Sequence, residues 1–393
     1  LAASSPTTRI TPMCGRRTAP DTALASKVGT GGREAVVAVM LGVLLYDLRS
    51  YFPKGALPVL SVLKRLLLLA LLVAVLAGAW GAWWWQKPLT LRLPAGQKVL
   101  DLAVPAGSSG AAAAQAVVDA GVDTPAWLLQ WAWRVAGDAR RIKAGSYEIG
   151  AGATPASVLD MLVRGEQALR QVTLVEGWTF RQVRAALQSA EHLQDDLKGL
   201  GNDAVMARIG LAGVHPEGRF FPDTYRYPKR SPASAVLKQA AQAMQQQLDA
   251  AWAQRAPGTP LKNATEALIL ASIVEKETGQ ASDRAQVAGV FSNRLRIGMR
   301  LQTDPSVIYG LGERFDGNLR RRDLEADTPY NSYTRAGLPP TPIAMPGKAA
   351  LLAAVRPADT QALYFVARGD GSSQFSATLD DHNRAVRQFQ LKR

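Results

Sequence analysis

The sequence predicts an α+β protein with a single N-terminal transmembrane helix, a small α+β domain and a larger domain that mixes helices and strands in α/β fashion. Two observations support this prediction. A run of 20 residues without a charge lies at 66–85 of the 393-residue chain. After residue 90, short alternating segments are repeatedly followed by a glycine, a hydroxyl residue and a helical pattern, which is typical of strand–turn–helix units. We therefore expect a tail at 1–65, a membrane helix at 66–85 and two domains at 90–168 and 169–393.

Composition excludes several classes of protein. The chain is 47% hydrophobic and 20% charged, which argues against a disordered protein. It has one cysteine and three widely separated histidines, so we expect no disulfide framework, no metal site and no cofactor. Residues 1–89 hold ten Lys and Arg against three Asp and Glu, which is +7 of the net charge of +14. The rest of the chain is only mildly basic for its length, and we expect no nucleic-acid partner.

The uncharged run at 66–85 predicts a membrane anchor. Twenty helical residues are about 30 Å long, the thickness of a bilayer's hydrocarbon core. Residues 1–65 hold nine Lys and Arg against three Asp and Glu, so we expect a disordered, cytoplasmic basic tail and a periplasmic C-terminal part on a single-pass inner-membrane protein. A cleaved signal peptide and a buried core helix are the alternatives. Tryptophans crowd the C-terminal end of the run, where an aromatic belt would lie: Trp80, Trp83, Trp84 and Trp85.

Three units beyond the anchor predict a strand, a glycine turn and a capped helix. Their expected N-caps are Ser109, Thr154 and Thr179. The first unit, with its V-P-A-G-S-S turn, resembles a LysM-type glycan-binding module; a small scaffold without a ligand is the alternative. An Ala-, Gln- and Leu-rich stretch at 234–253 predicts a long helix.

A candidate catalytic carboxylate lies at the end of a helix predicted at 264–278 and stopped by Gly279. Apolar neighbours and the helix dipole both disfavour the charged form of Glu277, so we expect a raised pKa, as a general acid requires. Glu275 lies about 200° away around the helix. The alternative is an ordinary solvated helix end. Spacing places four residues on one stripe: Leu270, Ile273, Val274 and Glu277.

Two further segments are expected to line a site. Residues 300–310 alternate as a strand that breaks at Pro305, and polar residues near such a break often face a ligand. Residues 328–343 form a loop rich in proline and glycine. A long loop that prolines hold in one conformation usually forms part of a functional site.

Seven short segments carry a resemblance to a known family. In this order they closely resemble the endolytic murein transglycosylases, called MltG or YceG-like, over about residues 91–390. The basic tail before residue 64 departs from that family. The segments are LVEGWTF (174–180), EGRFFPDTY (217–225), SIVEKE (272–277), NRLRIGMRLQTDPSVIYGLG (293–312), YNSYTRAGLPPTPI (330–343), YFVA (364–367) and HNRAV (382–386).

The resemblance implies a lytic transglycosylase with a lysozyme-like catalytic glutamate at a helix end. Such an enzyme cleaves the MurNAc–GlcNAc bond of nascent peptidoglycan near the membrane without water and leaves a 1,6-anhydro end. It implies peptidoglycan strands and peptidoglycan synthases as partners. The family's catalytic glutamate falls on Glu277.

We expect five residues to contact the substrate near Glu277. Gln302 and Thr303 would donate or accept hydrogen bonds, Asn331 and Tyr333 would line the cleft, and Asp304 is either a second carboxylate or a turn cap. Two alternatives stay open at this point. One is a muramidase-type hydrolase that uses Glu277, Asp304 and water, and the other is a non-catalytic peptidoglycan-binding scaffold.

Overall fold

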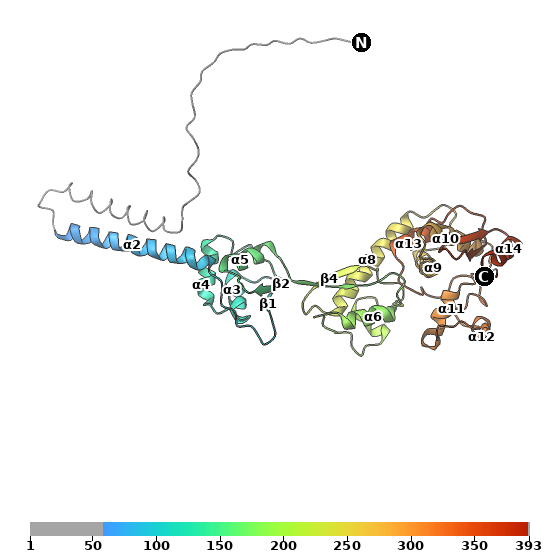
Figure 1. The fold of residues 1–393 in the computed structure, drawn as a ribbon, viewed down its shortest axis with the longest axis horizontal. Helices are drawn as coiled ribbons and strands as arrows, with labels where there is room; N and C mark the ends of the chain where they lie inside the picture. Colours follow the sequence, from blue (N-terminus) through green and yellow to red (C-terminus); the bar gives the residue numbers. More distant parts are fainter. Residues whose placement is uncertain (1–57, 392–393) are drawn as a thin grey trace, which may run out of the picture. The chain divides into compact units, whose positions relative to one another are not determined.

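The computed structural model describes residues 58–391, in which helices alternate with short strands (Figure 1). The predicted α+β class is confirmed, but the described residues contain only two-stranded ribbons, so the larger domain has no extended α/β sheet. The tail predicted at 1–65 lies outside the described residues except for its last eight positions. The ribbons are antiparallel pairs: β1 (Val99–Val104) with β2 (Gly145–Gly150), β3 (Leu169–Thr173) with β4 (Thr224–Pro228), and β5 (Tyr364–Ala367) with β6 (Ser373–Ser376).

Helix α2 (Pro58–Gln86) contains the predicted membrane span. Its stretch Ser61–Gln86 has 26 residues and is apolar enough to cross a bilayer, and none of it is buried by protein. Leu67, for example, is 63% exposed. The core helix of a water-soluble domain buries such leucines, so this exposure argues against the core-helix alternative.

A first hydrophobic core lies between residues 89 and 162. In the β1–β2 ribbon, Leu100 is opposite Ile149, and alternate side chains face the core. Ser109 Oγ accepts a hydrogen bond from Ala112 N–H at 3.2 Å, and Thr154 forms a capping box, as predicted. The core ends before residue 168, where a domain boundary stays a prediction. Its helices are α3 (Gly110–Asp119), α4 (Ala126–Val135) and α5 (Pro155–Arg164).

A second core surrounds the β3–β4 ribbon, with helices α6 (Phe180–Ser189) and α7 (Asn202–Arg208). At the start of α6, Thr179 N–H donates to Gln182 Oε1 at 2.9 Å. Helix α8 (Ala233–Ala253) confirms the helix predicted at 234–253 and links this core to the next. Its first half contributes Leu237 here, and its second half contributes Leu248 to the third core.

The third core forms around α9 (Ala264–Glu277), against which α8, α10 (Ala281–Arg296) and α13 (Lys348–Val355) pack. Eight consecutive residues, 267–274, are buried, so α9 is enclosed until its last turn. The chain therefore reaches the surface in the last turn of α9, at 275–277. The remaining helices are α11 (Asp304–Leu311), the 3-10 turn η2 (Gly312–Arg314), α12 (Arg321–Glu325) and α14 (Leu379–Phe389).

Two local predictions are wrong. The strand expected at 300–310 is replaced by an irregular loop at 300–303 followed by α11, which has Pro305 in its first turn. Proline suits that position because its fixed φ is helical and its missing N–H is not needed there. Helix α9 ends at Glu277 because Thr278 has an extended backbone (φ −143°, ψ 127°). Gly279 does not adopt the left-handed conformation that is typical of a glycine that ends a helix.

Candidate active site

Glu277 lies where the buried helix α9 meets the solvent. Asn263 starts this helix, since its Oδ1 accepts a hydrogen bond from Glu266 N–H at 2.9 Å. Glu277 itself is partly exposed. The residue thus reaches the solvent while its surroundings are enclosed enough to disfavour ionisation of the carboxyl group. The apolar members of the predicted stripe are fully buried: Leu270, Ile273 and Val274.

The surroundings of Glu277 hold its pKa near neutrality. Burial raises the pKa of Glu277 to about 7, and the negative charge of Asp304 acts in the same direction. The Thr303 hydroxyl, which donates to Glu277 Oε1 at 2.5 Å, and the positive charge of Arg294 both lower this pKa. A carboxyl group with a pKa near 7 can both give and take a proton at neutral pH, as acid–base catalysis requires.

Arg294 organises the loop that faces Glu277, and the sequence analysis missed it. It is 6% exposed, and it donates to Leu301 O at 2.6 Å and to Leu363 O at 2.7 Å. The spacing rule that selected Glu277 could have found it. Arg294 continues an apolar stripe of α10 at i, i+3, i+4 and i+7: Val287, Val290, Phe291 and Arg294.

Ser332 fixes the other side of the same loop. Its Oγ accepts a hydrogen bond from Thr303 N–H at 2.9 Å, and its backbone oxygen accepts one from Gln302 N–H at 3.1 Å. Gln302 has a left-handed backbone with φ 51° and an exposed side chain. Such a backbone is uncommon for residues other than glycine, and it often marks a functional site.

The structure brings Asp304 and Tyr333 together beside Glu277. Tyr333 Oη donates to Asp304 Oδ1 at 2.5 Å. Burial is the main cause that raises the pKa of Tyr333, and the charges of Asp304 and Glu277 add to it. Asp304 is exposed as the first residue of α11, whose N-cap is Thr303; its predicted roles as second carboxylate or turn cap stay predictions.

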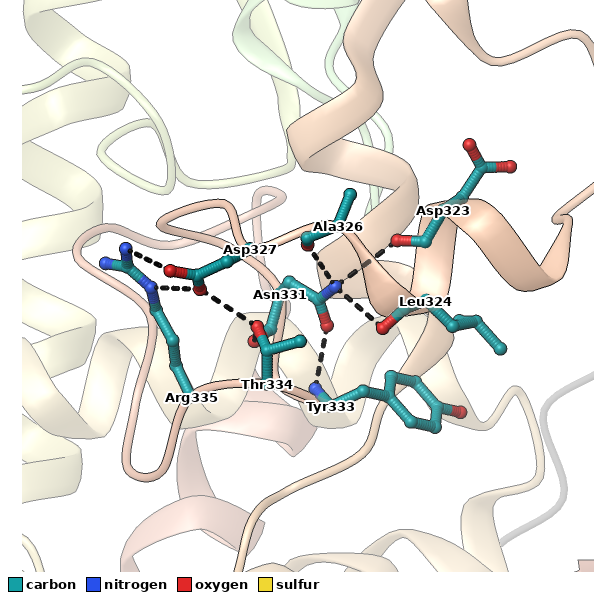
Figure 2. A network of polar contacts seen from close by, with 8 residues as sticks. All are labelled: Asp323, Leu324, Ala326, Asp327, Asn331, Tyr333, Thr334 and Arg335. Atoms are coloured by element: carbon teal, nitrogen blue, oxygen red, sulfur yellow. Dashed lines mark hydrogen bonds and ion pairs between the residues drawn. The ribbon is translucent and has the colours of Figure 1, made fainter.

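Thr303 and Asn331 are each 1% exposed, and their side chains are already hydrogen-bonded within the protein. The Thr303 hydroxyl is used by Glu277. The Asn331 amide lies at the centre of the network in Figure 2, with its Oδ1 accepting from Tyr333 N–H at 2.9 Å. That these two side chains contact a substrate stays a prediction; in the structure their hydrogen bonds go to Glu277 and to the Tyr333 backbone. The two N–H groups of Asn331 Nδ2 are shared among three carbonyl oxygens, those of Asp323 (3.2 Å), Leu324 (3.0 Å) and Ala326 (2.6 Å).

Glu217 is a second buried carboxyl group, 4% exposed, which the sequence analysis did not single out. Its Oε1 accepts a hydrogen bond from Phe180 N–H at 2.9 Å, and the Tyr309 hydroxyl donates to the same side chain. Burial raises the pKa of Glu217 to about 7. Glu217 thus ties the first residue of α6 to the middle of α11. A single glutamate among turn-forming residues gives no sequence signal for such a role.

Glu217→Gln should stabilise the protein more at pH 8 than at pH 5. Between the unfolded pKa of 4.5 and the folded pKa of about 7, the native wild type binds more protons at Glu217, so its stability falls as pH rises. Glutamine does not ionise, so the variant avoids this loss of stability. Its gain in free energy of unfolding is about 3 kcal/mol at most, because a pKa difference of one unit between the folded and unfolded states corresponds to about 1.36 kcal/mol. Urea unfolding at both pH values measures the difference. The exposed Glu313→Gln variant is the control, and an equal gain at both pH values would contradict the prediction.

The fold places one carboxyl group with a raised pKa at a helix end, and two buried side chains, Arg294 and Ser332, hold the loop that faces it. The family model described as the YceG-like family matches residues 102–388. This chain belongs to the YceG-like family, and the predicted resemblance is confirmed.

Named relatives and one solved structure are similar to this chain. The endolytic murein transglycosylase of Bacillus subtilis (strain 168) is 32% identical over 310 residues, covering 74% of this chain and 84% of that protein. The endolytic murein transglycosylase of Streptococcus pneumoniae (serotype 2, strain D39) is 28% identical over 283 residues, covering 62% of this chain and 50% of that protein. A crystal structure of a putative yceG-like protein from Listeria monocytogenes is 27% identical and covers 73% of this chain and 98% of that chain, with a TM-score of 0.47.

Proposed function

We propose that this protein is an endolytic lytic transglycosylase that cleaves MurNAc–GlcNAc bonds of nascent peptidoglycan. Membership of the YceG-like family and the names of its relatives support the class of reaction. The observation that carries the proposal is Glu277, a partly exposed carboxyl group with a pKa of about 7 at the end of a buried helix.

The proposed reaction needs one carboxyl group used twice. Protonated Glu277 gives its proton to the glycosidic oxygen, the bond from that oxygen to the MurNAc anomeric carbon breaks, and positive charge develops on the sugar ring, as in glycoside hydrolysis. The C6 hydroxyl of the same MurNAc then forms a bond to the anomeric carbon. Glu277, now a carboxylate, takes the proton of that hydroxyl. Because the attack is intramolecular, it gains from proximity, and the product is a 1,6-anhydro end.

Gln302, Asp304 and Tyr333 are the proposed substrate contacts. Gln302 and Asp304 are exposed beside Glu277, and Tyr333 joins Asp304 through its hydroxyl. For Thr303 and Asn331 we propose positioning roles, because their buried side chains bond to Glu277 and to the Tyr333 backbone.

A hydrolase remains the second candidate because Asp304 lies close enough to Glu277 to raise its pKa. A hydrolase would use Asp304 as nucleophile or as base for water. Mass spectrometry of sacculi digested by the purified full-length chain separates the two. Anhydro ends support the transglycosylase, and reducing ends support the hydrolase. If no fragment is released, the protein is a scaffold and the proposal fails.

We propose that α2 is retained as a single-pass anchor, with the N-terminus in the cytoplasm and residues after Lys87 in the periplasm. The length and composition of α2 and the excess of Lys and Arg before residue 66 support this orientation. Action close to the membrane, on strands made by peptidoglycan synthases, follows from such an anchor. The LysM-like character of residues 90–168 stays a prediction.

Thr303→Val should slow cleavage and move the alkaline limb of its pH profile to higher pH. The Thr303 hydroxyl lowers the pKa of Glu277, so its loss lets Glu277 keep its proton at higher pH. The maximal rate should fall roughly tenfold, because the loss of one hydrogen bond raises the activation free energy by about 1.4 kcal/mol. Rates of fragment release between pH 5 and 9 measure both effects. Thr303→Ser keeps the hydroxyl and should restore the wild-type profile; an unshifted profile in the valine variant would refute this role.

A further inference from the structure

One face of α4 is apolar, aromatic and exposed to solvent. Trp127 is 67% exposed, Trp131 is 58% exposed and Val135 is 68% exposed. They lie at i, i+4 and i+8, with the exposed Arg134 beside them, so the four side chains share one side of the helix. We name this set the α4 face.

The fold does not need the α4 face for its own core. The opposite side of α4 buries Leu129 and Trp133 completely, and Trp133 Nε1 donates to Pro155 O at 3.3 Å. Helix α4 already buries one side in the core, yet two large indole rings on its other side are exposed to water. Exposed aromatic surface of this kind indicates a binding partner.

The start of α4 is attached to the chain that leaves the membrane helix. Thr90 O accepts a hydrogen bond from Asp123 N–H at 2.8 Å, and Arg92 N–H donates to Gly121 O at 2.8 Å. Thr90 is only four residues after Gln86, the last residue of α2, which is at most about 14 Å of extended chain. Asp123 is three residues before Ala126, where α4 begins. The start of α4 is therefore connected to the end of α2 by only a short length of chain.

The charges beside the α4 face suit an anionic surface. Among the described residues, Arg134 and Arg140 have no carboxylate partner, whereas Arg141 pairs with Asp138 at 2.8 Å. Tryptophan and arginine on one side of a helix are typical of segments that lie in the headgroup region of a bilayer. A glycan strand would also need hydrogen-bonding groups around the indole rings for its hydroxyl groups, whereas the other exposed residues on this side of α4 are Val135 and Arg134.

We propose that the α4 face binds the headgroup region of an anionic phospholipid membrane and forms a second contact beside the α2 span. The tryptophans enter the interface, and Arg134 and Arg140 meet phosphate groups. This second contact holds the first domain against the bilayer and limits how far the site at Glu277 can move from it. The proposal rests on the membrane anchoring proposed above.

The full chain in nanodiscs tests it. In a Cys14→Ser background, an environment-sensitive fluorophore is attached at Val135→Cys, and the control label is attached at Ile297→Cys, which is 63% exposed in the C-terminal part. Nanodiscs of phosphatidylglycerol and phosphatidylcholine carry a lipid quencher at headgroup depth. We expect quenching at position 135 and none at 297. Trp127→Ala with Trp131→Ala should remove most of the quenching at 135, and discs of pure phosphatidylcholine should weaken it.

Each other outcome overturns the proposal. Equal quenching at 135 and 297, or none at 135 in a chain that co-purifies with nanodiscs, refutes the α4 contact and leaves the anchor intact. A label at 135 that responds to murein fragments and not to the lipid quencher assigns the face to glycan. A chain that fails to insert into nanodiscs contradicts both the anchor and this proposal, while the cleavage assay with sacculi still tests the reaction separately.

Discussion

Glu277→Gln should lower the rate of murein cleavage by about 10² to 10⁴, the usual contribution of a general acid–base group. Glutamine has nearly the same shape and can still accept the hydrogen bond from the Thr303 hydroxyl. It cannot give a proton to the glycosidic oxygen or take one from the C6 hydroxyl. Fragment release from purified sacculi, measured at pH 6, gives the rates of both proteins.

Glu275→Gln is the matched control for Glu277→Gln. It lies two residues earlier on the same helix, but its Oε2 accepts a hydrogen bond from Gly347 N–H at 2.9 Å. Burial is the main cause that raises the pKa of Glu275, and the charge of Glu176 adds to it. The control should keep most of the wild-type rate. Loss of activity in the Glu275 variant together with full activity in the Glu277 variant would transfer the catalytic role to the other glutamate.

The pH dependence of the wild type follows from the same group. With a pKa of about 7, Glu277 is protonated below that pH and is ready to act as the acid. Cleavage at low substrate concentration, which reports the free enzyme, should therefore fall as pH rises through about 7. The Glu277→Gln variant should lose this alkaline limb.

The sequence predicted the helix-end acid because its signal is local. The stripe that ends in Glu277 needs only the period of an α-helix, and the same rule applied to α10 would have found Arg294. The strand predicted at 300–310 is wrong because alternation is a weak signal where the backbone groups of Leu301 and Thr303 bond to the side chains of Arg294 and Ser332 instead of to a neighbouring strand. The hydrogen bond from Thr303 to Glu277 joins residues 26 positions apart, which spacing does not reveal. The bonds of Asn331 reach no further than eight residues, but they depend on how an irregular loop folds back on itself, which has no periodic signal.

Asn331→Ala should destabilise the protein by about 2–4 kcal/mol, because it leaves three backbone carbonyl groups and the Tyr333 N–H without their partner in a nearly closed site (Figure 2). The chain around α12 and the loop that carries Tyr333 would then separate. Cleavage should fall with kcat reduced more than KM is raised, since the positions of Tyr333 and Asp304 become less fixed.

Gln302→Ala provides the contrast, since the Gln302 side chain is exposed and only its backbone is held. The free energy of unfolding of Gln302→Ala should stay within about 0.5 kcal/mol of wild type. Its KM should rise, because Gln302 is a proposed substrate contact. Urea unfolding and fragment-release kinetics on both variants separate the two roles. A rise in KM without loss of stability in Asn331→Ala would return Asn331 to the substrate contacts, because a side chain that holds three carbonyl groups together cannot be removed without a cost in folding.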